Sequence, residues 1–229
     1  MEIGECVMKS LSESAEEYLE AIYRLEGDKK DIVKISRVVK FLKLTPSTVT
    51  EMLQRLSKRG LVQYMPFQGV KLTEKGARIA NRIIRRHRLV ERLLTDMLKI
   101  ETTKVHKEAC RLEHAISPYL EDKIEELLGY PKTCPHGNPI PAKNGKRSKQ
   151  PKSLVETMPP ARVLITRIVR EDERFLNSVN DIGIVINAEV RVLSKNPETR
   201  SLTIMVDGVK HILSFDFAKF IKIKPVSKN

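Results

Sequence analysis

The 229-residue chain lacks several features that mark common protein classes. It has no tryptophan, only 5% aromatic residues, and three cysteines, Cys6, Cys110 and Cys134, with no C-x-x-C pair. An odd number of scattered cysteines argues against a disulfide framework and favours a reducing compartment. No apolar run approaches the roughly 20 residues that a bilayer span needs, and the acidic first residues lack the apolar core of a signal peptide. We therefore expect a cytoplasmic protein with no membrane partner.

Charge is present in excess and is unevenly distributed along a chain of net charge +13. Residues 1–28 contain two basic and eight acidic residues, a balance of −6, whereas residues 29–75 contain eleven basic and three acidic residues, a balance of +8. A basic block of this size is typical of a surface that binds phosphate, although on its own it also fits a solvated face.

The first 75 residues have the periodicity of a winged helix. Helical spacing predicts a helix over 12–25 and another from Val33 to the LTPS break, followed by a third that Thr45 caps and Pro46 begins. Two short alternating segments around a Pro66–Gly69 turn then predict a β-hairpin. In a helix-turn-helix the second helix enters the major groove of DNA.

Position along these elements separates two groups of candidate DNA contacts. The candidates for contacts in the groove are Thr45, Ser47, Thr48, Thr50 and Glu51, and the candidates for phosphate contacts are Lys43, Arg55, Lys58, Arg59 and Lys71. The alternative is a helical hairpin and a β-hairpin used for protein contact alone, which leaves the +8 charge without a role.

The stretch 104–117, KVHKEACRLEHAIS, contains the most potential metal ligands. At about 100° per residue, His106, Cys110, Glu113 and His114 share one face of a predicted helix. In the preceding helix, predicted from Glu74 to about Leu98, a His87/Glu91 pair has i, i+4 spacing, which places the two side chains one above the other.

Any one of these residues alone is more often a packed or solvated side chain. Together, however, thiol, imidazole and carboxylate groups suit first-row transition metals. Neither helix contains H-E-x-x-H, so a sensor site is favoured over a hydrolytic one.

The rest of the chain predicts a dimer, a linker and a small β domain. An apolar stripe at Leu120, Ile124, Leu127 and Leu128 exceeds what a two-helix region can bury alone, which favours packing against a second subunit in a two-fold dimer. Residues 131–160 contain seven prolines and a basic run, the composition of a flexible linker.

Within this predicted linker, Cys134 and His136 carry ligand atoms, but the flanking prolines and the absence of neighbouring ligands argue against a metal site there. From residue 162 to 224 the period is two, with an Asp207-Gly208 hairpin turn, which predicts an antiparallel barrel. The acidic run from Glu171 to Glu173 in the first turn of this barrel is expected to be solvated.

At RRHRLVERLLTDML, KVHKEACRLEH and HGNPIP the sequence resembles the diphtheria toxin repressor family of metal-dependent transcriptional regulators. The resemblance covers the whole chain and implies an α+β fold. The implied parts are a winged helix-turn-helix domain over 1–76, a helical metal-binding and dimerisation domain over 77–141, a basic Pro-containing linker over 142–160 and an SH3-like antiparallel β-barrel over 161–229.

The resemblance also implies up to two metal sites per subunit. The positions that match the first site are Glu17, Glu20, Cys110, Glu113 and His114. The positions that match the second site are His87, Glu91 and His106, completed by Glu173 or, as a weaker match, Glu171. The acids at Glu17 and Glu20 are typical of the manganese branch of the family, whereas Cys110 is typical of the iron branch.

Because a thiolate is a poor ligand for Mn²⁺, these residues favour Fe²⁺, with Mn²⁺ second and Zn²⁺, Co²⁺ or Ni²⁺ as substitutes in vitro. The expected function is a metal-dependent repressor, not an enzyme, whose homodimer binds palindromic operator DNA and controls genes of metal uptake and homeostasis. No small-molecule substrate is expected. Two alternatives are a metal-dependent hydrolase, which lacks a clear general base, and a winged-helix regulator of an organic effector.

Overall fold

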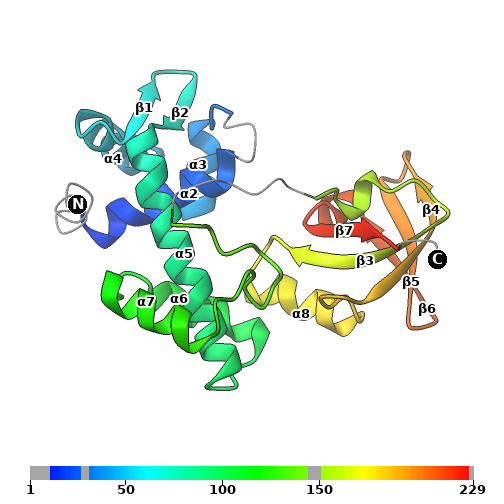
Figure 1. Ribbon diagram of the computed structural model, residues 1–229. Helices are drawn as coiled ribbons and strands as arrows, with labels where there is room; N and C mark the ends of the chain where they lie inside the picture. The colour runs from blue at the N-terminus through cyan, green and yellow to red at the C-terminus, as the bar shows by residue number, and fades with distance from the viewer. Residues whose placement is uncertain (1–10, 27–30, 144–150, 227–229) are drawn as a thin grey trace. The chain divides into compact units, whose positions relative to one another are not determined.

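Helix α5 (Glu74–Asp96) is the longest element, and its residues contribute to two packing units. The computed structural model describes residues 11–26, 31–143 and 151–226 (Figure 1). Among these, the first unit contains the residues up to His87 with 113–115 and 141–143, and the second contains 88–112, 116–140 and 151–226. No helix in the described ranges is both long and apolar enough to cross a membrane.

The first unit has the predicted winged-helix order. Its elements are α2 (Glu13–Glu26), α3 (Ile35–Leu42), α4 (Pro46–Lys58), β1 (Val62–Met65), β2 (Gly69–Leu72) and the first part of α5. The Oγ1 of Thr45 accepts a hydrogen bond from the Thr48 N–H at 3.3 Å, which confirms the predicted cap of α4. Leu19, Val38 and Leu53 are fully buried in one core that also contains residues of the hairpin, so these elements pack as one body.

The hairpin of β1 and β2, the wing, is fixed at its base. Val33 and Val70 exchange backbone hydrogen bonds of 2.8 and 2.9 Å. Gly69 has φ +146°, and a Cβ there would lie 2.4 Å from the Val33 carbonyl oxygen. Only glycine allows this approach, which explains its position directly after the turn.

The helical part of the second unit consists of the end of α5, α6 (Thr102–Leu112) and α7 (Pro118–Leu127), with Leu94, Val105 and Ile124 in its core. The expectation of one helix over 104–117 is wrong, because α6 ends at Leu112 and residues 113–115 form a turn. Pro118 begins α7, and a proline disfavours helical geometry in the residue before it. Ser117 instead caps α7, accepting from the Leu120 N–H at 3.1 Å.

The C-terminal part is an antiparallel sheet of order β6-β5-β4-β3-β7 (Figure 1), which confirms the SH3-like domain. Its elements are η1 (Leu154–Glu156), β3 (Ala161–Ile168), α8 (Glu173–Asp181), β4 (Glu189–Asn196), β5 (Ser201–Val206), β6 (Val209–Ser214), α9 (Phe215–Ala218) and β7 (Ile221–Pro225). The predicted Asp207-Gly208 turn joins β5 and β6.

Two expectations for the C-terminal half need correction. The acidic run is not wholly solvated: Asp172 and Glu173 are exposed, but Glu171 is buried, and Asp172 caps α8, accepting from the Phe175 N–H at 3.2 Å. Helix α8 forms because Phe175, Leu176 and Val179 share one buried face. Residues 131–142 are not a flexible linker either, since several of their side chains are buried and Thr133 bridges Pro139. The central part of the predicted linker, 144–150, lies outside the described residues.

Candidate metal centres

A first cluster of ligand atoms lies within the first unit. The Glu20, His87 and Glu113 side chains, from α2, α5 and the turn after α6, place their ligand atoms within 4.8 Å of one another. The Nδ1 of His87 lies 2.5 Å from the Oε2 of Glu113, and both side chains are almost fully buried. Glu20 also forms an ion pair with Arg24 at 2.7 Å.

His114 extends this cluster, and Glu16 fixes its orientation. The Nδ1 of His114 lies 2.6 Å from the Oε2 of Glu16, and its Nε2 lies 3.3 Å from the Oε1 of Glu113. Since a carboxylate can only accept, Nδ1–H donates to Glu16 and directs Nε2 toward Glu113. We call Glu20, His87, Glu113 and His114 the α2 set.

The electrostatics of the α2 set favour bound positive charge. Burial raises the pKa of Glu113 above its ordinary value, although the hydrogen bond from His87 and the charge of His114 oppose this. The hydrogen bond to Glu16 raises the pKa of His114, against the opposing effect of burial. Buried carboxylates are costly unless they are paired or bind a metal, and this oxygen and imidazole chemistry fits Mn²⁺ or Fe²⁺.

A second cluster lies within the second unit. Glu91, Cys134, His136 and Glu171 are all buried, and their ligand atoms lie within 4.8 Å of one another. We call these four residues the Cys134 set. His106 stands beside it, with its Nδ1 3.5 Å from the Oε1 of Glu91 and 3.7 Å from the Oε2 of Glu171.

Hydrogen bonds outside the Cys134 set orient two of its members. The Nε2–H of His136 donates to the Thr102 carbonyl at 2.8 Å, which directs Nδ1 toward Glu91, 3.4 Å away. The Nδ2 of Asn138 donates to the Oε1 of Glu171 at 2.6 Å. Outer hydrogen bonds of this kind orient the ligands of protein metal sites.

Burial and neighbouring charges shift the pKa values of two residues in the Cys134 set. Burial raises the pKa of the Cys134 thiol. Burial alone would lower the pKa of His136, but Cys134, Glu91 and Glu171 raise it to about 11. The imidazole of His136 is therefore held in its protonated form between two carboxylates. A divalent cation bound there would displace this proton and the proton of the Cys134 thiol. A set with one thiolate, one imidazole and two carboxylates fits Fe²⁺ or Zn²⁺.

Three domain models match the chain in order, two of them from iron-dependent repressors. The N-terminal DNA-binding domain of iron-dependent repressors matches residues 10–70, their metal-binding and dimerisation domain matches residues 73–142, and the FeoA domain matches residues 152–225. The diphtheria toxin repressor of Corynebacterium glutamicum is 31% identical over 96% of this chain and 99% of its own length. This chain belongs to the diphtheria toxin repressor family. Its members are transcriptional repressors with a DNA-binding domain, not enzymes.

Other comparisons agree with this family. The iron-dependent repressor IdeR of Mycobacterium tuberculosis is 31% identical over 96% of this chain and 100% of its own length. A solved manganese-dependent transcriptional repressor in complex with manganese has a TM-score of 0.85 and 30% identity over 93% of this chain and 100% of that chain. The structure of ScaR with bound Zn²⁺ has a TM-score of 0.83 and 27% identity, over 93% and 99%. The family is thus metal-dependent, and its relatives differ in the metal that they are named for.

The fold brings together some of the residues that the family resemblance singles out. Glu20, Glu113, His114 and His87 lie in the α2 set, while Glu91 and His106 lie in or beside the Cys134 set. Three others are exposed residues. Glu17 and Glu173 are exposed, next to the buried Glu16 and Glu171. Cys110 is exposed with its Sγ 3.8 Å from the Nε2 of His106.

Sequence reasoning missed that Cys134 and His136 lie beside Glu91 and Glu171. The available signal was their C-x-H spacing in a segment that also contains Asn138, but the prolines on both sides favoured a linker. The structure shows why the prolines mislead: the segment is a tight turn, in which the Gly137 N–H donates to the Cys134 carbonyl at 2.9 Å.

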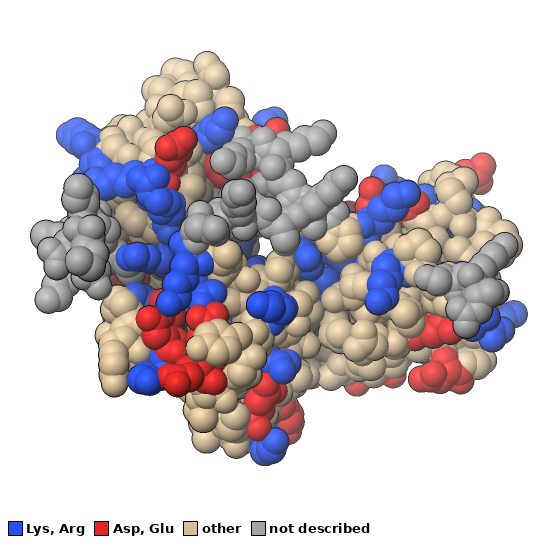
Figure 2. Space-filling view, viewed as in Figure 1, with Lys and Arg blue, Asp and Glu red and all other residues tan. Residues whose placement is uncertain are grey.

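Several of the predicted DNA contacts lie on the exposed side of α4. Ser47, Thr48 and Glu51 are exposed, and Glu51 forms a 2.5 Å ion pair with Arg55. The hydroxyl of Thr50 instead donates to the Pro46 carbonyl at 2.8 Å. Figure 2 shows Lys and Arg side chains gathered over the part of the first unit that contains α4.

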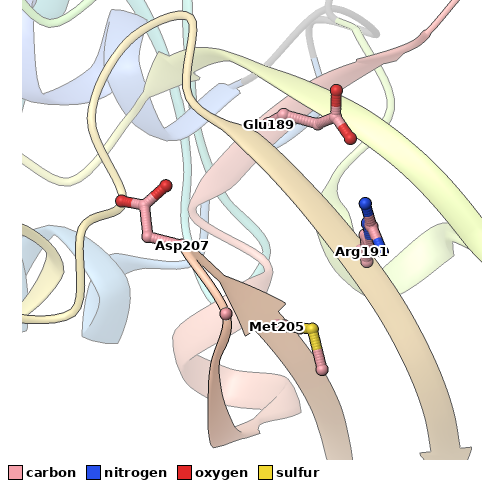
Figure 3. Close-up of a pocket in the computed structure, with 5 residues that line it drawn as sticks. Glu189, Arg191, Met205 and Asp207 are labelled. Carbon is pink, nitrogen blue, oxygen red and sulfur yellow. The ribbon is translucent and has the colours of Figure 1, made fainter.

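A pocket on the C-terminal sheet lies at the start of β4 and the β5–β6 turn. It is lined by Glu189, Arg191, Met205, Asp207 and Gly208, and Figure 3 shows the side chains of the first four.

Proposed function

We propose that this repressor binds divalent cations at the α2 set and at the Cys134 set, and that this binding activates it for operator DNA. One observation carries the proposal: each unit contains a buried cluster with at least two carboxylates and one imidazole. Clusters of this kind are expensive to bury without a cation, so their presence is best explained by a bound metal.

The donors favour Fe²⁺ as the physiological metal. The α2 set has only oxygen and nitrogen donors and accepts Mn²⁺ or Fe²⁺ equally well, whereas the thiolate in the Cys134 set disfavours Mn²⁺. Fe²⁺ is the ion that suits both sets. Mn²⁺ is the second choice, and Zn²⁺, Co²⁺ or Ni²⁺ would substitute in vitro. The assignments of Glu17, Cys110 and Glu173 as ligands remain predictions from the family resemblance.

The α2 set links metal binding to the DNA-binding domain. A divalent cation bound there would neutralise the negative charge of the Glu20 and Glu113 carboxylates. Glu20 belongs to α2, whose Leu19 and Ile22 share the core of α4, so fixing Glu20 against His87 and Glu113 also fixes the helix that reads DNA. For a useful switch the metal must prefer the DNA-competent arrangement by a few kcal/mol.

We further propose a homodimer that binds palindromic operators of metal-homeostasis genes in the cytoplasm. Large apolar side chains are exposed in the helical part of the second unit, namely Met97, Leu98, Leu112, Tyr119, Leu120, Leu127 and Tyr130. Apolar exposure on this scale is typical of a surface that another subunit covers. A two-fold dimer would give two α4 helices the spacing that palindromic half-sites require.

An operator-binding titration tests the proposal. DNA selected from a random pool by the Fe²⁺-loaded protein is titrated anaerobically with wild type, Glu113→Gln and Cys134→Ala. We expect wild-type binding to disappear on chelation, and each variant to need about ten-fold or more higher metal for half-maximal binding. Asp207→Asn, in the β5–β6 turn, is the control and should behave as wild type. Wild-type metal dependence in both variants would remove the two sets from the proposed function.

A further inference from the structure

The wing ends in an aromatic side chain that nothing in the first unit covers. The exposed fraction of Phe67 is 108%, the largest value among the large hydrophobic residues that the structure describes. Its φ is +62°, in the left-handed region that bulky residues rarely adopt. A phenyl ring held in water on an unfavourable backbone is costly, and such costs are concentrated at functional sites.

The wing cannot withdraw this ring into the core. The turn is closed by a hydrogen bond from the Gln68 N–H to the Met65 carbonyl at 3.1 Å. Below it, Val62 and Val70 are buried in the common core, and Val70 is also bonded to Val33. The ring is therefore presented at a fixed place relative to α4, whose Leu53 lies in the same core.

The charge of the chain on both sides of Phe67 points to the class of its partner. Residues 52–73, from the middle of α4 to the end of the wing, include no acidic residue and four basic ones, Arg55, Lys58, Arg59 and Lys71, of which Arg55 pairs with Glu51. This surface suits a polyanion. A phenyl ring gains little from contact with phosphates, but it can stack on nucleic-acid bases. Apolar side chains that insert between base steps are a known mode of minor-groove binding.

We propose that Phe67 is a wedge that the wing inserts between base pairs in the minor groove beside the major-groove site of α4. This inference rests on the proposed function. Gln68, exposed next to Phe67, has an amide that can bond the base edges of the same groove. The wedge would kink the DNA at this step and add affinity without adding a phosphate contact.

Three measurements on Phe67→Ala in the metal-loaded full chain test the wedge. On DNA selected by the wild type, we expect affinity to fall about ten-fold, the magnitude typical of a lost base-aromatic stack. A 2-aminopurine placed at the flanking steps should brighten on wild-type binding and not on binding of the variant. The dependence of affinity on salt should not change, because no ionic contact is lost.

A matched control separates the wedge from a general effect of an exposed apolar residue. Ile212→Ala removes an apolar side chain of 75% exposure from β6 and should bind as wild type does. The melting temperature of Phe67→Ala should equal that of wild type, since the ring touches no core. Phe67→Ala affinity within two-fold of wild type, with the same 2-aminopurine signal, would overturn the wedge alone. A wild type that binds no DNA with metal would overturn the proposed function itself.

Discussion

At the residue scale, the neighbouring acids Glu16 and Glu17 show how one position along a helix decides a role. Successive helical residues are about 100° apart, so only one of the two can face His114, and in this structure it is Glu16. The hydrogen bond from Nδ1–H to a carboxylate is the usual way in which a metal-ligating histidine is oriented. We therefore propose Glu16 as a positioning residue for His114, whereas the family resemblance implies Glu17 as a ligand.

The substitutions Glu16→Gln and Glu17→Gln distinguish these two assignments. If Glu16 orients His114, then Glu16→Gln should weaken Mn²⁺ binding at the α2 set by about ten-fold, because a neutral acceptor supports the imidazole less. Glu17→Gln is the matched control, one residue away and exposed, and should leave the affinity within two-fold. Calorimetric titration of both variants measures this. The reverse ranking would show that Glu17 is the ligand and that α2 must turn to bring it inward.

The sequence predicts the residue types at both sets better than it predicts their grouping. His87, Glu91 and His106 follow from helical spacing and ligand chemistry, whereas Glu113 and His114 were predicted on a helix but lie in the turn after α6. Glu171 does not follow from the sequence, because the burial of one acid in an acidic run depends on where α8 begins. Cys134 and His136 do not either, because their partners lie far away in sequence, on α5 and before α8.

At the element scale, the winged helix was predictable because local signals agree with the fold. Thr45 and Pro46 specify the start of α4, and the Pro66–Gly69 turn specifies the wing. The end of α6 was not predictable, because ideal helical spacing continues past Leu112 and the break depends on Pro118. Helix α8 was hidden by its acidic start, although Asp172 is a good cap.

Two glycines in the first unit allow a test of how the wing is held. Gly69→Ala should lower the free energy of unfolding by about 3 kcal/mol, because the added Cβ meets the Val33 carbonyl at φ +146°. Gly60→Ala is the matched control: its φ is +67° and nothing lies within 4 Å of the added Cβ, so only about 1 kcal/mol of backbone strain is expected. Urea unfolding of the metal-free protein measures both, and equal losses would show that the wing is not pinned at Val33.

At the scale of the whole molecule, the exposed apolar residues of the helical region should form the subunit interface. The substitution Leu127→Asp places a charge on a side chain with 62% exposure in α7, and we expect the dimer to weaken at least ten-fold. Ile212→Asp, on a similarly exposed residue of the C-terminal sheet, is the control and should leave the dimer intact. Light scattering across a range of concentrations reports the result, and an unchanged dimer in Leu127→Asp would place the interface elsewhere.

We propose that this repressor holds its metals in two buried sets, one beside the DNA-binding helices and one around Cys134. The most direct measurement is anomalous diffraction at the metal edge from crystals grown anaerobically with Fe²⁺. We predict one peak within bonding distance of Glu113 and His87 and another within bonding distance of Cys134 and His136. Crystals that bind iron elsewhere, or that leave both sets without an anomalous peak, would contradict the account.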